Sequence, residues 1–177
     1  MKKNERKKIL FTDEEIQRRN RELGDIISND YMGKDLVIIS LLRGSFIFTS
    51  DLVRNIKIPV EIDFMTTSSY GNEKESTGNV EIISRIRSDI KERDVLVVDD
   101  IMDTGLTMKY VIDYLKGHSP NSIKTCVFLN KPSRRKIDLK PDYIGFDIPD
   151  IFIVGYGLNY GNYYRNMPYI FTFEEDN

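Results

Sequence analysis

The chain has 177 residues, of which 40% are hydrophobic and 31% are charged, and its net charge is -2. This length suits a single domain, the composition excludes a disordered chain, and the charge gives no indication of a nucleic-acid or membrane partner. No segment approaches the ~20 apolar residues that span a bilayer, and the apolar stretch after the basic residues 1–8 is too short for a secretory signal, so we expect a cytoplasmic protein.

The first half of the chain alternates helical patterns with apolar strands. Residues 12–15 form a capping box, and the apolar spacing after it predicts a helix over residues 13–28. The continuous apolar run at 36–42 predicts a strand that is buried on both faces. The patterns that follow predict a helix from about Phe46, a strand over 60–65, a loop over 68–78 and a strand over 80–86.

The second half continues this alternation. Residues 95–98 predict a short buried strand, and apolar residues at helical spacing predict a helix over 108–115. We expect further strands over 122–129, 151–156 and 169–173, with a basic, proline-containing connection over 131–142. Apolar strands that alternate with helices indicate an α/β protein with a mainly parallel, twisted sheet flanked by helices.

The chain has one cysteine and one histidine, which excludes an internal disulfide and a zinc site of the Cys/His type. Cys126 lies in an apolar run and is expected to be a buried strand residue. His118 stands beside Gly117, where a helix is expected to end. Acid–base chemistry must therefore come from carboxylates, lysines or tyrosines.

Ligands of parallel sheets bind beyond the carboxyl ends of the strands, so the residues at those ends carry the functional signal. Arg43 and Gly44 follow one strand, Asp99 and Asp100 follow another, and Lys131 follows a third.

The segment 99–107 combines two kinds of ligand-binding group. The backbone N–H groups of residues 104–107, at the start of a helix, form an anion cradle, and Gly105 allows close approach. Asp99 and Asp100 can bind a sugar diol or a hydrated Mg²⁺. Together they indicate a phosphorylated sugar, whereas a Walker motif is absent. The alternative is that Asp103, Thr104 and Thr107 only cap the helix, but three acids directly after a buried strand favour a binding site.

Residues 95–107 resemble the phosphoribosyl-pyrophosphate signature of type I phosphoribosyltransferases, which is an apolar strand, two acids, two apolar residues and Asp-Thr-Gly-x-Thr. Several further segments resemble bacterial hypoxanthine-guanine phosphoribosyltransferases, and they are residues 68–71, 131–135, 145–150, 154–160 and 164–165. The resemblance runs from about residue 35 to residue 173.

The resemblance implies the type I phosphoribosyltransferase fold as a single domain over 1–177, with a core of about 35–140 and a small hood from about 1–34 and 141–177. It implies purine salvage, in which the 5-phosphoribosyl group of phosphoribosyl pyrophosphate is transferred to hypoxanthine or guanine, with xanthine as a third candidate. The products are IMP or GMP and pyrophosphate, the cofactor is Mg²⁺, and relatives form homodimers or homotetramers.

The resemblance also assigns roles to residues. Asp103 matches a general base near purine N7, and Lys131 matches a donor to purine O6; the alternative for Lys131 is a solvated loop lysine. The phosphoribosyl-binding residues would be Asp99, Asp100, Asp103, Thr104, Gly105, Leu106 and Thr107. The pyrophosphate-binding residues would be Arg43, Gly44, Arg165, Ser69 and Tyr70, the last two in a mobile loop. The purine-binding residues would be Ile101, Lys131, Phe152, Ile153 and Asn159, and the metal ligands would be Asp99, Asp100 and, weakly, Asn159.

Three residues depart from the family pattern. Asn159 stands where an Asp is usual, and an amide is a weaker metal ligand than a carboxylate. Asp99 replaces a frequent Glu and Arg43 a frequent Lys. In the family the peptide before the position of Arg43 is often cis, so we expect a cis bond between Leu42 and Arg43.

A second function class is a regulator that keeps this fold, senses phosphoribosyl pyrophosphate and binds nucleic acid. Asp103 and Lys131 argue against it, because a sensor needs neither, and so does the acidic net charge.

Overall fold

The protein is described here from a computed structural model, which covers the backbone of residues 6–70 and 79–174 and their side chains apart from those of 68–70, 79 and 80. In this part of the chain six strands form one sheet in the order β4-β3-β2-β5-β6-β7, and every neighbouring pair is parallel except β3 with β4. The strands of this sheet are β2 (Leu36–Leu42), β3 (Val60–Tyr70), β4 (Asn79–Ser84), β5 (Asp94–Met102), β6 (Ser122–Asn130) and β7 (Tyr143–Asp147).

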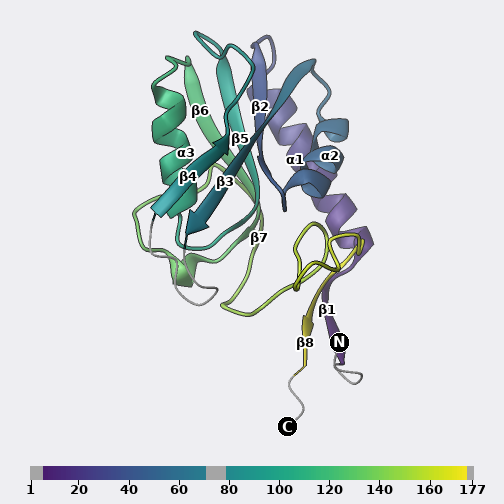
Figure 1. The fold of residues 1–177 in the computed structure, drawn as a ribbon. Helices are drawn as coiled ribbons and strands as arrows, with labels where there is room; N and C mark the ends of the chain where they lie inside the picture. Colours follow the sequence, from purple (N-terminus) through teal and green to yellow (C-terminus); the bar gives the residue numbers. More distant parts are fainter. Residues whose placement is uncertain (1–5, 71–78, 175–177) are drawn as a thin grey trace.

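Helices cover both faces of this sheet, as Figure 1 shows. Helices α1 (Asp13–Asp30) and α2 (Phe46–Asn55) pack on one face, and α3 (Leu106–Lys116) packs on the other. Side chains alternate between the two layers, so that Ile38 of β2 faces α1 and α2 while Val37 and Ile39 face α3. The predicted α/β architecture is confirmed, and β2 and the first part of β5 are buried on both faces as expected.

The local signals at the helix ends are also confirmed. The Thr12 hydroxyl accepts from the Glu15 amide, and the Glu15 carboxylate accepts from the Thr12 amide at 2.9 Å, which is the predicted capping box. Cys126 is fully buried in β6, and His118 follows the end of α3, where its ring nitrogen Nδ1 lies 3.1 Å from the Tyr114 carbonyl.

The two ends of the chain pair with each other. Strands β1 (Lys7–Phe11) and β8 (Ile170–Phe173) form a two-stranded antiparallel sheet, and β1 was not predicted. The Phe11 ring stacks on Phe146 of β7 at a centroid distance of 4.2 Å, which ties the small sheet to the large one. The segment after β7 runs between the two sheets, at the end where the parallel strands finish (Figure 1). From here on the hood means only β1, β8 and residues 148–169, because α1 packs on the large sheet.

Two sequence predictions of secondary structure are wrong, and one strand besides β1 was missed. Residues 151–156 are not a strand, because Gly155, Tyr156 and Gly157 all have positive φ angles of 101°, 49° and 97°, which no extended strand contains. Strand β7 was not predicted, since it is short and follows a polar segment. The predicted loop from residue 68 begins later, because β3 continues to Tyr70 and pairs with β4; residues 71–78 lie outside the described part of the chain.

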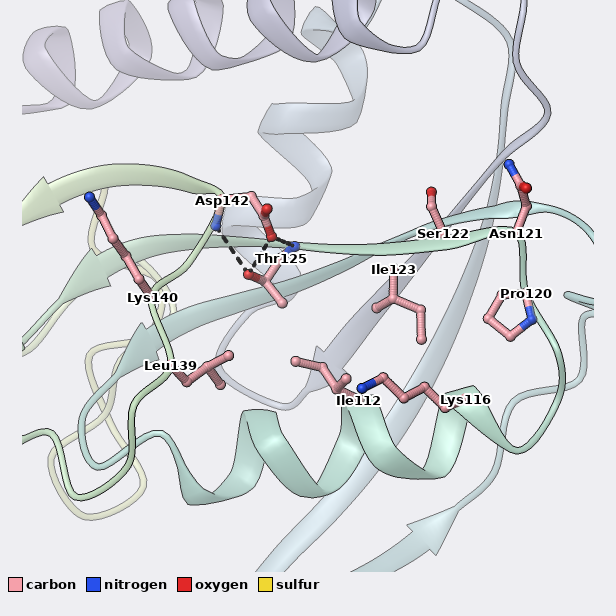
Figure 2. A pocket seen from close by; sticks show the side chains of 10 residues that line it. All are labelled: Ile112, Lys116, Pro120, Asn121, Ser122, Ile123, Thr125, Leu139, Lys140 and Asp142. Carbon is pink, nitrogen blue, oxygen red and sulfur yellow. Dashed lines mark hydrogen bonds between the residues drawn. The ribbon is translucent and has the colours of Figure 1, made fainter.

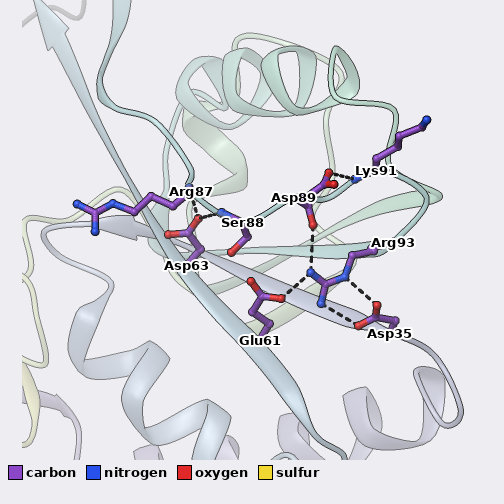
Figure 3. Close-up of polar contacts among 8 residues, drawn as sticks. All are labelled: Asp35, Glu61, Asp63, Arg87, Ser88, Asp89, Lys91 and Arg93. Atoms are coloured by element: carbon purple, nitrogen blue, oxygen red, sulfur yellow. Dashed lines mark hydrogen bonds and ion pairs between the residues drawn. The ribbon is translucent and has the colours of Figure 1, made fainter.

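The amino ends of β2, β3 and β5 are joined by ionic contacts, as Figure 3 shows. The Arg93 guanidinium donates to both carboxylate oxygens of Asp35 at 2.8 Å and to Glu61 at 2.5 Å. Within the described residues, the structure has no helix that is both long enough and apolar enough to cross a membrane.

Candidate active site

The carboxyl ends of β2 and β5 meet the hood in close backbone packing. A Cβ atom on Gly44 would lie 1.8 Å from Asp100 Oδ2, and a Cβ atom on Gly157 would lie 2.1 Å from the Gly44 carbonyl oxygen. A side chain at position 157 would meet backbone, and one at position 44 would displace the Asp100 carboxylate, so Asp100, Gly44 and Gly157 form one contiguous wall. The peptide bond between Leu42 and Arg43 at this wall is cis, as expected. Arg43 is exposed.

Arg165 reaches the same wall from the hood. Its guanidinium donates to the Gly157 carbonyl at 2.5 Å, and its positive charge acts to lower the pKa of Asp100. Arg43, Gly44 and Arg165 therefore lie around one region, and their role in binding pyrophosphate stays a prediction. Ser69 and Tyr70 end strand β3, but their side chains lie outside the described residues.

The segment between β5 and α3 forms an open helix N-terminus. Gly105 is the N-cap residue with φ 84°, and the first turn of α3 contains no acidic residue. Asp103 makes no hydrogen bond to the helix through its side chain in the described part of the chain, and Thr104 contributes only a long contact of 3.4 Å to the Leu106 amide. The capping interpretation of these residues therefore finds little support, and the N–H groups from Leu106 onward are available to an anion.

Asp99 and Asp100 form a half-buried pair of adjacent carboxylates. Burial raises the pKa of Asp99 well above its usual range, and the charge of Asp100 raises it further. Burial also raises the pKa of Asp100. A divalent cation would relieve this unfavourable concentration of negative charge, so the pair fits Mg²⁺. Among the described residues no group of three or more His, Cys, Asp or Glu side chains could hold a metal, so the pair would supply only part of the ligand set.

Asp103 and Lys131 lie beside each other as a loose ion pair. Lys131 Nζ lies 3.7 Å from Asp103 Oδ1, which is beyond hydrogen-bonding distance, and its side chain is only 8% exposed. Within the described residues, Asp103 Oδ1 is buried without a hydrogen-bond partner. A buried acceptor of this kind is costly unless a ligand completes it. The pair therefore offers a donor, the Lys131 ammonium, and an acceptor, the Asp103 carboxylate, side by side.

Residues 131–136 hold this pair, and the sequence predictions did not include most of them. The Lys131 amide donates to the Met102 carbonyl at 3.0 Å, and the Lys136 amide donates to the Thr104 carbonyl at 3.1 Å. The Arg135 guanidinium donates to the Asp103 carbonyl at 2.8 Å and to the Asn130 side chain. The basic character of this segment and its place in the family resemblance were the signals that could have indicated its role.

Arg134 and Asp150 are two further charged residues beside the pair. Arg134 Nη1 donates to Asp150 Oδ1 at 3.1 Å, and Asp150 Oδ1 lies 3.7 Å from Lys131 Nζ. Neither residue was a sequence candidate.

The hood contributes an exposed aromatic ring and a buried neighbour. Phe152 is 57% exposed although it lies among buried residues, and the ring of Tyr160 meets it edge-on at 5.7 Å. Ile153 is buried and Ile101 is half-buried. The Asn159 side chain is exposed and donates to the Gly161 carbonyl, so its NH₂ group is engaged within its own turn.

A separate cavity of about 460 Å³ lies at the opposite end of the sheet, between α3 and the amino ends of β6 and β7 (Figure 2). Its polar lining includes Lys116, Lys140 and Asp142, and Asp142 accepts hydrogen bonds from Thr125. It contains none of the predicted site residues, and it lies away from the strand ends where ligands of parallel sheets bind.

Comparison with known proteins gives matches over nearly the whole chain. The family model of the phosphoribosyl transferase domain matches residues 8–161. The hypoxanthine-guanine phosphoribosyltransferase of Aquifex aeolicus (strain VF5) is 46% identical over 169 residues, which are 95% of each chain. That of Bacillus subtilis (strain 168) is 42% identical over 170 residues, covering 96% of this chain and 94% of the relative.

Solved structures give the same result. A crystal structure of a hypoxanthine phosphoribosyltransferase from Staphylococcus aureus superimposes with a TM-score of 0.91 and 46% sequence identity. The match covers 94% of this chain and 91% of that one.

Proposed function

The chain belongs to the phosphoribosyl transferase family, and we propose from this and from its site that it is a purine-salvage enzyme. It transfers the 5-phosphoribosyl group of phosphoribosyl pyrophosphate to hypoxanthine or guanine, with xanthine as a further substrate to be tested. The products are IMP or GMP and pyrophosphate.

The observation that carries the choice of substrate is the pairing of Lys131 with Asp103. A 6-oxopurine presents the O6 acceptor and the N7 position side by side on one edge. An ammonium and an unpartnered carboxylate oxygen, 3.7 Å apart, complement that edge when N7 carries its proton. Adenine would place an amino group against Lys131 and leave the ammonium without an acceptor, which strongly disfavours it.

Asp103 acts as the general base in this proposal. In the N7–H tautomer of the purine the lone pair of N9 is free to attack C1 of the ribose. As the N9–C1 bond forms and the bond from C1 to pyrophosphate breaks, the N7 proton becomes acidic and moves to the Asp103 carboxylate. Such proton transfer typically contributes ~10²–10⁴-fold to the rate.

The other residues bind and orient the two substrates. The backbone of Thr104, Gly105, Leu106 and Thr107 holds the 5-phosphate at the N-terminus of α3. Asp99 and Asp100 hold the ribose hydroxyls and Mg²⁺, which when bound neutralises charge on the leaving pyrophosphate. Arg43, Gly44 and Arg165 bind the pyrophosphate itself, together with Ser69 and Tyr70.

The purine is sandwiched at the hood. Phe152 stacks on the base, since an aromatic side chain that is 57% exposed gains by covering an aromatic ligand. Ile101 packs against the purine. The backbone of Ile153 and residue Asn159 contribute polar groups at the edge of the base. Asn159 is at most a weak ligand for a second Mg²⁺, because its side chain is an exposed amide that already bonds within its turn.

The proposal extends to the setting of the enzyme. We place it in the cytoplasm as a homodimer or homotetramer that binds no nucleic acid. Ile62, Phe64 and Ile83 of β3 and β4 are exposed apolar side chains that an oligomer would cover. Light scattering after gel filtration gives the oligomeric state, and filter binding tests for nucleic acid.

Initial rates with hypoxanthine, guanine, xanthine and adenine test the function. Each base is supplied with phosphoribosyl pyrophosphate and MgCl₂, and pyrophosphate release is followed. We expect turnover with at least hypoxanthine and guanine and none above background with adenine. Absence of turnover with every 6-oxopurine would reject the enzyme.

A further inference from the structure

Four charged side chains at the mouth of the purine site form a closed ring of alternating charge. Lys131 Nζ lies 3.7 Å from Asp103 Oδ1 and 3.7 Å from Asp150 Oδ1. Arg134 closes the ring on the other side, with Nη1 3.1 Å from Asp150 Oδ1 and Nε 3.9 Å from Asp103 Oδ2. We call these four residues the charge ring.

The position of Lys131 within the charge ring is unusual. Its side chain is only 8% exposed, yet it stands at equal distance from two carboxylates and hydrogen-bonds to neither. A buried ammonium with a single carboxylate nearby would close on it, because the attraction between opposite charges is strong where water is excluded. The attraction of Asp150 from the other side explains why Lys131 Nζ does not close on Asp103.

We propose that Asp150 is a positioning residue for Lys131, and that Arg134 holds Asp150 in place. The inference rests on the proposed function, in which the Lys131 ammonium donates to purine O6. Asp150 draws Lys131 away from Asp103, so that the ammonium stays free for the purine and the Asp103 carboxylate stays free for the N7 proton. Arg134 fixes Asp150 through both carboxylate oxygens, at 3.1 and 3.4 Å.

The arrangement also explains why an exposed ion pair stands beside a buried lysine. The side chains of Arg134 and Asp150 are 45% and 50% exposed, so their pairing adds little to the stability of the fold. Loss of Asp150 leaves two cations, Lys131 and Arg134, that share Asp103 as their only nearby carboxylate among the described residues. Lys131 then closes on Asp103, and both groups are withdrawn from the purine.

The decisive experiment is steady-state kinetics of Asp150→Asn with each substrate varied in turn. We expect the KM for hypoxanthine to rise about tenfold, equivalent to ~1.4 kcal/mol, and the KM for phosphoribosyl pyrophosphate to stay within about twofold. Asp138→Asn is the matched control, because Asp138 is an exposed aspartate in the segment that follows Lys131 and lies outside the charge ring. It should leave both KM values unchanged.

Arg134→Met tests the second part of the proposal. It should raise the KM for hypoxanthine in the same direction as Asp150→Asn, with Arg54→Met, an exposed arginine on α2, as its control. Since Arg134 acts through Asp150, the double variant should be no worse than Asp150→Asn alone. Additive losses in the double variant would show that Arg134 acts independently, and would reject that part.

The remaining outcomes separate the positioning role from its premise. An active wild-type enzyme whose hypoxanthine KM is unchanged by Asp150→Asn overturns the inference and leaves the proposed function intact. Equal increases in both KM values, or a large drop in Tm, would show a general structural role and would also overturn it. A wild-type enzyme that is inactive with every 6-oxopurine rejects the proposed function itself.

Discussion

Gly44 and Asp100 lie so close together that a single methyl group on Gly44 would occupy the position of the Asp100 carboxylate, 1.8 Å from Oδ2. The loop after β2 and the end of β5 are thus fitted to each other at the proposed pyrophosphate and Mg²⁺ site. This contact has a direct consequence for substrate binding.

Gly44→Ala should displace the Asp100 carboxylate and weaken the binding of phosphoribosyl pyrophosphate with Mg²⁺. We expect its KM to rise by about tenfold or more, equivalent to ~1.4 kcal/mol of binding free energy. Gly117→Ala is the control, since Gly117 has a φ angle of -62° that alanine adopts without strain and ends α3 on the side away from the site. The measurement is steady-state kinetics with phosphoribosyl pyrophosphate varied. An unchanged KM for this substrate in Gly44→Ala would mean that Asp100 does not contact it.

Asp103→Asn should remove the proposed base while it keeps the shape of the site. We expect kcat to fall by ~10²–10⁴-fold, because the amide cannot accept the N7 proton. Phosphoribosyl-pyrophosphate binding, measured by calorimetry, should change little, as it depends on Asp99, Asp100 and the cradle. Equal losses in turnover and in binding would contradict the assignment of Asp103 as a base, and Asp138→Asn again serves as control.

The central sheet and the start of α3 after β5 were predictable from sequence because local patterns encode them. The apolar run at residues 36–42 leaves no solvated face, so only a doubly covered strand fits, and the capping box at Thr12 and Glu15 fixes the start of α1. The acids at 99, 100 and 103 follow directly from a buried strand. The separate role of each acid, however, was predicted from the family resemblance and not from the spacing.

The hood and the charge ring depend on contacts between distant segments and could not be predicted in this way. Val154 pairs with Phe171 and β1 pairs with β8, so the structure of each segment is set by a partner far along the chain. The apolar residues at 151–156 suggested a strand, but the positive φ angles around Tyr156 turn the backbone toward Gly44 instead. Asp150 joins Lys131 only because η1 (Pro132–Arg134) and the start of the hood are folded together.

Asp99→Asn should make the metal-free protein more stable and the enzyme less active. Because the folded-state pKa of Asp99 is raised, the folded protein disfavours its ionised form, and the free energy of unfolding falls as the pH rises from about 4 through the folded pKa. At pH 7 with EDTA, the variant should therefore have a Tm that is higher by roughly 2–4 °C, as expected for ~1 kcal/mol in a chain of this size.

Magnesium provides the comparison for this variant. Mg²⁺ with phosphoribosyl pyrophosphate should raise the Tm of the wild type more than that of Asp99→Asn, because the variant has lost one of the two carboxylates. A variant that is less stable than the wild type in EDTA would contradict the electrostatic account of the pair.

Asp63 offers the reverse case, an acid that is stabilised in its ionised form. Although burial raises its pKa, hydrogen bonds from the backbone amides of Ser88, Phe64 and Arg87 outweigh this effect and lower it. These contacts measure 2.8, 2.7 and 2.5 Å. Those from Ser88 and Arg87, which Figure 3 shows, join the connection between β4 and β5 to β3.

Asp63→Asn should lower the free energy of unfolding at pH 7 by ~1–3 kcal/mol, the usual cost of losing charge-assisted hydrogen bonds at a buried site. A folded pKa below the unfolded value of about 3.9 means that the stabilisation is complete above that value and is lost as the pH falls through the folded pKa. The difference between wild type and variant, measured by urea unfolding from pH 7 to pH 3, should therefore be constant down to about pH 4 and then shrink. A difference that stays constant over the whole range would assign the effect to packing and not to the charge of Asp63.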